Sequence, residues 1–97
     1  MKEYYQMEIG LGYQKELQGI LYHSGLHKKP LRKMFTSDNI TVTYKVRTHM
    51  LSFGSAERSP KVIVSISAAK KADADNLAER IESALIKKTG IRTFKRG

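Results

Sequence analysis

The segment 40–47, with the sequence ITVTYKVR, alternates apolar and polar residues along its whole length. Because successive side chains of a β-strand point to opposite faces, this period of two predicts a strand with one buried and one exposed face. The apolar positions hold β-branched and aromatic residues, which favour the same structure. A strand of this kind needs a second layer of structure to cover its apolar face.

The segment 5–13 shows the same alternation, and in the segment 62–66 the apolar residues Val62, Val64 and Ile66 occupy every second position. The first predicts an N-terminal strand, and the second predicts a strand that returns beside 40–47 as a hairpin. The apolar register of the earlier strand is expected to slip at 50–51, as a β-bulge allows, before a turn at 54–60.

Two other segments space their apolar residues by three and four, which predicts amphipathic helices. The first helix is expected to begin at Gln14 and to end at Gly25, where glycine can take the left-handed conformation that closes a helix. The second is expected to be capped at its start by Asp73 and to end at Gly90.

Short strands are also expected within 31–36 and 91–94, so that the predicted order is β-α-(β)-β-β-α-(β). This pattern indicates an α+β fold: a two-layer sandwich with a mainly antiparallel sheet of about three to five strands and two helices on one face. The 97 residues leave room for one core, which predicts a single small basic domain over 1–97. Within it we expect a basic loop over 26–38 and a basic C-terminal tail over 91–97.

The chain has 18 Lys and Arg against 9 Asp and Glu, a net charge of +9. The whole excess lies in two segments without acids, and the remainder of the chain is neutral. The first segment contains Lys28, Lys29, Arg32 and Lys33, and the second contains Lys87, Lys88, Arg92, Lys95 and Arg96. Clusters of this kind attract polyanions, and both are expected to converge on one continuous patch after folding.

The face of the sheet that the helices leave open is expected to be polar and basic. From one strand it should display Thr41, Thr43, Lys45, Arg47 and His49, and from another Lys61, Ser65 and Ser67. The leading prediction is therefore a non-enzymatic nucleic-acid-binding module, for DNA or RNA, that contacts phosphates through Lys28, Lys29, Arg32, Lys33, Lys45, Arg47, Lys61, Lys87, Lys88, Arg92, Lys95 and Arg96.

Few residues of the sequence favour catalysis or metal binding. The chain has no Cys, which excludes disulfide scaffolds, zinc ribbons and cysteine nucleophiles. His23 and His27 have the spacing of a helical metal site, but Gly25 lies between them as the expected helix stop. The serines at 52, 55 and 59 lack a nucleophile elbow. We predict no catalytic residue, no metal ligand and no cofactor.

Asp73, Asp75, Glu79 and Glu82 lie on the second predicted helix, where the last three are expected on its solvated face. The run Asp73-Ala74-Asp75-Asn76-Leu77, after the strand at 62–66, resembles the DxDNL segment of RusA-type Holliday junction resolvases over roughly residues 62 to 90. The resemblance implies metal-dependent cleavage of branched DNA with Asp73 and Asp75 as ligands, although the chain has no acid after Glu82 to complete such a set. This is a minor alternative.

Lys70 and Lys71 precede the same helix and are similar to the lysines that open the last helix of double-stranded RNA-binding domains, over about residues 61 to 88. That resemblance implies contacts with phosphates and makes double-stranded RNA an admissible target. Phe35 and Phe94, each near a lysine, are expected either to fill the core or to stack on bases.

A second alternative is a structural or assembly subunit that binds protein partners or itself, since small sheets with exposed edges associate readily. No segment approaches the 18 or so apolar residues of a membrane helix, and Glu3 and Glu8 interrupt the start of the chain where a signal peptide would be apolar. We therefore expect a cytoplasmic protein with no membrane partner.

Overall fold

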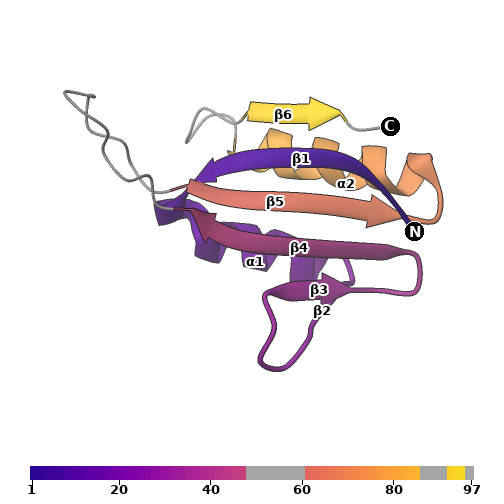
Figure 1. The fold of residues 1–97 in the computed structure, drawn as a ribbon, viewed down its shortest axis with the longest axis horizontal. Coiled ribbons are helices and arrows are strands. Elements are labelled where there is room, and N and C mark those ends of the chain that lie inside the picture. Colours follow the sequence, from indigo (N-terminus) through magenta and orange to yellow (C-terminus); the bar gives the residue numbers. More distant parts are fainter. Residues whose placement is uncertain (48–60, 86–91, 96–97) are drawn as a thin grey trace.

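The computed structural model describes residues 1–47, 61–85 and 92–95. Their elements are β1 (Lys2–Gly10), a 3-10 turn (Leu11–Tyr13), α1 (Gln14–His23), β2 (His27–Lys28), β3 (Met34–Thr36), β4 (Ile40–Arg47), β5 (Lys61–Ala68), α2 (Lys71–Leu85) and β6 (Arg92–Lys95). The strands form one sheet in the order β2-β3-β4-β5-β1-β6, and every neighbouring pair is antiparallel (Figure 1).

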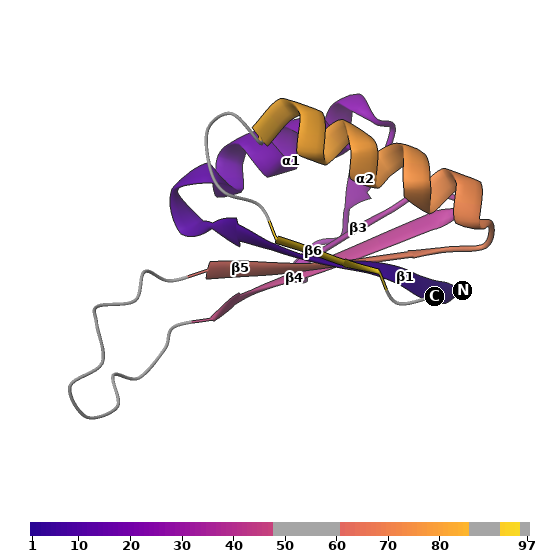
Figure 2. The same ribbon diagram turned by 90° about the horizontal axis from the view of Figure 1, so that it is seen from above.

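Both helices lie on the same face of this sheet, which confirms the predicted two-layer α+β sandwich (Figure 2). Strands β1 and β4 are parallel to each other, with the antiparallel strand β5 between them. Strands β5 and β6 are likewise parallel, with β1 between them. This is the β-α-β-β-α-β arrangement of two split β-α-β units, known as ferredoxin-like. The short hairpin of β2 and β3 is inserted between α1 and β4.

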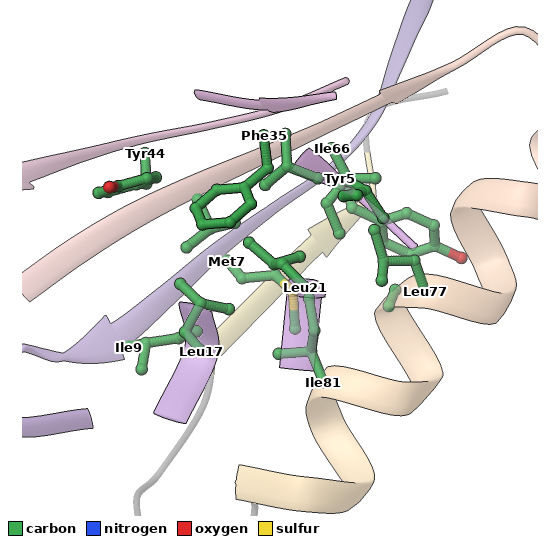
Figure 3. Close-up of a cluster of buried hydrophobic side chains, with 14 of the residues drawn as sticks. Tyr5, Met7, Ile9, Leu17, Leu21, Phe35, Tyr44, Ile66, Leu77 and Ile81 are labelled. Carbon is green, nitrogen blue, oxygen red and sulfur yellow. The ribbon is translucent and has the colours of Figure 1, made fainter. Parts of the chain in front are cut away.

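The core lies between the helices and one face of the sheet (Figure 3). Alternate residues of β1, namely Tyr5, Met7 and Ile9, face this layer, as their period of two predicts. The helices cover them with the apolar stripes that their spacing predicts: Leu17 and Leu21 from α1, and Ala74, Leu77, Ala78, Ile81 and Leu85 from α2. The open face of the sheet is thereby left for other contacts.

The first strand is shorter than its alternation predicts, because it ends at Gly10 and not at Tyr13. Gly10, the last residue of β1, pairs with Lys61, the first residue of β5. Residues Leu11–Tyr13 instead form a 3-10 turn that leads into α1. The helix then begins at Gln14, as predicted.

The expected helix cap at Asp73 is wrong. Helix α2 begins at Lys71, and the backbone N–H groups of Asp73 and Ala74 donate to the carbonyl of Lys70 at 3.2 and 3.5 Å. Asp73 therefore lies in the first turn, where its charge complements the positive end of the helix dipole.

The segment 26–38 was expected to be a basic loop with a short strand within 31–36. The strand is present as β3, and a second short strand, β2, pairs with it. The closing strand expected at 91–94 is β6, shifted by one residue. The register slip at 50–51, the turn at 54–60, His49, the three candidate serines and the helix stop at Gly90 all lie outside the described residues.

Candidate nucleic-acid interface

Strands β2 and β3 and the turn 29–33 between them form what we call the basic hairpin. Its backbone is closed by two hydrogen bonds: the N–H of Lys29 donates to the carbonyl of Met34 at 2.9 Å, and the N–H of Arg32 donates to the carbonyl of Lys29 at 3.3 Å. The Nζ of Lys28 donates to the carbonyls of Arg32 and Lys29 at 3.1 and 3.4 Å. The turn is therefore held by backbone and side chain together, while Lys29, Arg32 and Lys33 are exposed.

Phe35 anchors the basic hairpin to the core. It is fully buried, with the ring of Tyr22 edge-on at 5.2 Å between centroids and the ring of Tyr44 at 6.1 Å. The backbone continues the connection, since the N–H of Tyr44 donates to the carbonyl of Lys33 at 3.0 Å. Of the two roles expected for Phe35, core filling is confirmed, and its burial excludes stacking on bases.

The open face of the sheet carries a ladder of hydroxyl groups. Thr41 pairs with Ser67, and Thr43 pairs with Ser65, across β4 and β5. The exposed Lys45 is the partner of Ile63 on the same two strands, and Arg47 is the register partner of Lys61. The register thus confirms the row of residues expected along this face, up to Arg47 and Lys61.

A small hollow of about 170 Å³ lies on this face, lined by Thr43, Tyr44, Lys45, Ile63 and Ser65. Ile63 is only 5% exposed although it belongs to the open face, so it forms an apolar floor. The rim offers one ammonium group and two hydroxyls, which can all donate hydrogen bonds to an anionic oxygen. A period of two does not predict this floor, because it places a polar residue at position 63, where the chain has an isoleucine.

The open face carries two carboxylates that the sequence prediction of this face does not include. The register pairs Glu3 of β1 with Ser67, and Glu8 with Ile63, so both belong to the same face as Lys45. The predicted open face draws its residues from two other strands, whereas the corresponding side of β1 carries these two acids. The open face is therefore basic on the β4 side and acidic on the β1 side.

Charge is distributed unequally between the two halves of the sheet. The segment 26–47, which contains β2, β3 and β4, has six bases and one acid, a net +5. By contrast, β1 has a net charge of −1 and α2 a net charge of −2. A polyanion is thus attracted to the β2–β4 half and repelled from α2.

The described residues of the two basic clusters do not converge as expected. β2, with Lys28, lies at one edge of the sheet, and β6, with Arg92 and Lys95, lies at the opposite edge. Five strand spacings of roughly 4.8 Å separate them by about 24 Å. The register partner of Arg92 is the acidic Glu8. The predicted contacts Lys87, Lys88 and Arg96 lie outside the described residues.

The carboxylate of Asp75 is not simply solvated, as we had expected. The hydroxyl of Tyr5 donates to its Oδ1, and the Nζ of Lys71 lies 3.4 Å from its Oδ2. The hydrogen bond to Asp75, together with burial and the negative charges of Asp75 and Glu82, raises the pKa of Tyr5 to about 12. The hydrogen bond between Tyr5 of β1 and Asp75 of α2 therefore connects this helix to the sheet. Within the described residues, no group of three acidic or histidine side chains is placed to hold a metal ion.

His27 lies in β2 and His23 at the end of α1, and both are exposed. The different elements follow from the turn at Gly25, whose φ of +87° ends the helix between them. Within the described ranges, neither helix is long and apolar enough to cross a membrane.

No protein-family model matches the chain, and no curated protein matches it. The segment at 73–77 and the lysines at 70–71 therefore remain local resemblances to the resolvases and to the double-stranded RNA-binding domains. The fold alone does not select a function, because ferredoxin-like domains host many. Any functional assignment must come from the charges and geometry of the interface itself.

Proposed function

We propose that this protein is a non-enzymatic module that binds the phosphate backbone of nucleic acid. The binding surface, which we call the basic surface, consists of the basic hairpin and the adjoining part of the open sheet face, with Lys28, Lys29, Arg32, Lys33, Lys45 and Lys61. The observation that carries the proposal is the net +5 of segment 26–47, which contains β4 and the basic hairpin that Phe35 anchors to the core.

The basic surface suits phosphates better than bases. Lysine and arginine supply charge, and the hydroxyls of Thr43 and Ser65 beside Lys45 supply additional donors to anionic oxygens. Among the described side chains of the open face, β4 and β5 place no aromatic ring outward, since Tyr44 is buried. Stacking on unpaired bases is therefore not part of the mechanism.

Five of these cations are available for phosphates, because the ammonium of Lys28 already donates to two carbonyls of the turn. Five neutralised phosphates correspond to a slope of log K against log salt of about −4.5 for duplex DNA. Binding of this kind selects polyanions with little dependence on sequence. Cations in β6 lie at the other edge of the sheet and are not part of this contact.

The test is the triple variant Lys29→Ala, Arg32→Ala, Lys33→Ala. Its three side chains are exposed, so the domain should remain folded, which circular dichroism checks. At about 0.1 M salt, the loss of three phosphate contacts should weaken binding to a labelled duplex by about 10²- to 10³-fold.

The matched control is Lys2→Ala, Lys15→Ala, Lys70→Ala, which removes the same charge from exposed positions outside the basic surface. Its affinity should fall much less. Equal losses in the two variants would show that net charge alone governs binding and would remove the proposed surface. A nuclease-treated sample that forms a defined oligomer and binds no nucleic acid would favour an assembly role.

A further inference from the structure

The turn of the basic hairpin presents a leucine to solvent. Leu31 is 103% exposed, compared with 65% for Met1 and 55% for Tyr22, the other large hydrophobic residues exposed among those described. It is flanked by Pro30 on one side and by Arg32 on the other. In Figure 1 the turn between β2 and β3 extends beyond β3 at the edge of the sheet.

The backbone at Leu31 is unusual. Its φ is +59°, and no other non-glycine residue in the described parts of the chain has a positive φ. Pro30 before it and the hydrogen bond from Arg32 to Lys29 match a type II turn, in which glycine or asparagine normally occupies this third position. A leucine here is disfavoured in the free protein, and such strain concentrates at sites that bind ligands.

We infer that Leu31 acts as an apolar wedge that enters the minor groove of duplex DNA and bends it. This inference rests on the proposed function and specifies its ligand. Leucine and proline side chains can insert between base steps from the minor groove and kink the duplex, while nearby cations hold the phosphates. The hairpin combines an exposed apolar tip with Lys29, Arg32 and Lys33 on both sides of it.

The dimensions of the hairpin favour this mode. The minor groove of B-form DNA is about 6 Å wide, too narrow for a helix but accessible to the tip of a tight turn. The turn is partly preorganised for binding, because the ring of Pro30 fixes the φ of that residue and the ammonium of Lys28 donates to the carbonyls of Lys29 and Arg32. Little order is therefore lost when the tip enters the groove. Duplex RNA has a wide and shallow minor groove, which such a wedge does not fit.

The alternative anionic surface, a lipid bilayer, fits less well. A single leucine buries too little apolar surface for stable membrane binding. DNA, in contrast, offers phosphates on both sides of a narrow groove, which matches cations on both sides of one apolar residue. Anionic vesicles nevertheless belong in the test as a separate arm.

The experiment compares the wild type with Leu31→Asn and Leu31→Met, using a short DNA duplex with a fluorescence donor and acceptor at its ends. Asparagine tolerates a positive φ but is polar, so this variant keeps the turn and removes the wedge. Methionine keeps an apolar side chain that can insert. Thermal unfolding should show no loss of stability for Leu31→Asn.

At saturation, the wild type and Leu31→Met should raise the energy transfer between the duplex ends, and Leu31→Asn should not. Affinity should change by less than about tenfold, because the gain from burying the wedge and the cost of unstacking the bases largely cancel. The salt dependence should be the same for all three proteins, since no charge changes.

Each other result has a definite meaning. Equal bending by Leu31→Asn, or no bending by the wild type at saturation, would overturn the wedge while leaving phosphate binding intact. Equal bending of a duplex RNA of the same sequence would overturn the choice of DNA. Binding to phosphatidylserine vesicles that is lost in Leu31→Asn, without DNA bending, would assign the tip to membranes. Absence of any salt-dependent binding to nucleic acid would instead reject the proposed function.

Discussion

The hydrogen bond between Tyr5 and Asp75 joins α2 to the second strand from the sheet edge, and its contribution can be measured with Tyr5→Phe. The substitution keeps the buried ring and removes only the hydroxyl that donates to the carboxylate. Hydrogen bonds to charged groups contribute about 1.5–3 kcal/mol. Because the side chain of Asp75 is 40% exposed and also pairs with Lys71, water can replace part of the interaction, and we expect the lower figure, about 1.5 kcal/mol at pH 7.

The pH dependence of this loss provides a second signature. The pKa of Tyr5 is raised from 10.0 to about 12 in the folded protein, first by its hydrogen bond to Asp75. Below pH 10, Tyr5 is protonated in both the folded and unfolded states, and its stabilisation is complete. Between pH 10 and 12 the unfolded chain releases the proton and the folded protein retains it, so this stabilisation falls as the pH rises.

Urea unfolding at pH 7 and pH 11, followed by circular dichroism, measures both effects. The stability difference between the wild type and Tyr5→Phe should be smaller at pH 11 than at pH 7. Tyr22→Phe serves as a control for removing an exposed hydroxyl and should change stability by less than about 0.5 kcal/mol. A Tyr5→Phe variant as stable as the wild type at pH 7, or a difference that does not shrink at pH 11, would refute the reasoning.

Two further predictions concern the anchoring of the basic hairpin and the hollow beside it. Phe35→Ala should lower the free energy of unfolding, measured in urea, by about 3–5 kcal/mol, because Phe35 is fully buried and contacts the rings of Tyr22 and Tyr44. A loss below about 1 kcal/mol would mean that Phe35 does not anchor the hairpin to the core. The double variant Thr43→Val, Ser65→Ala should weaken nucleic-acid binding by about tenfold, which corresponds to the loss of roughly one hydrogen bond of 1.4 kcal/mol. The slope of log K against log salt should stay the same, because no charge changes. An altered slope would show that the hydroxyls act through the placement of charge.

Much of the fold follows from local periodicity. The apolar residues at every second position of 40–47 and 62–66 predict β4 and β5, and the helical spacing predicts α1 and α2, because most of the residues that form these patterns are buried in the core. The exact ends of elements depend on partners that periodicity does not contain. The alternation of the first strand continues to Tyr13, whereas β1 ends at Gly10, opposite Lys61 of β5.

The interface is harder to predict, because cross-strand register and strand order decide which charges meet. The sequence identifies two basic clusters but not that the sheet places Lys28 of the first at one edge and Arg92 and Lys95 of the second at the other. It also could not reveal that Glu8 lies in the same row as Lys45, since this neighbourhood arises from β5 lying between β1 and β4. The positive φ of Leu31 is equally hidden, because Pro30 suggests a turn while leucine is an unusual residue for that position.

The most direct test of phosphate binding by the basic surface is the salt dependence of duplex binding, measured by fluorescence anisotropy between about 50 and 200 mM salt. The wild type should give a slope of log K against log salt of about −4.5, and the triple variant of Lys29, Arg32 and Lys33 a slope of about −2, since three of five contacts are removed. A shallow slope for the wild type, or the same slope for both proteins, would contradict the account.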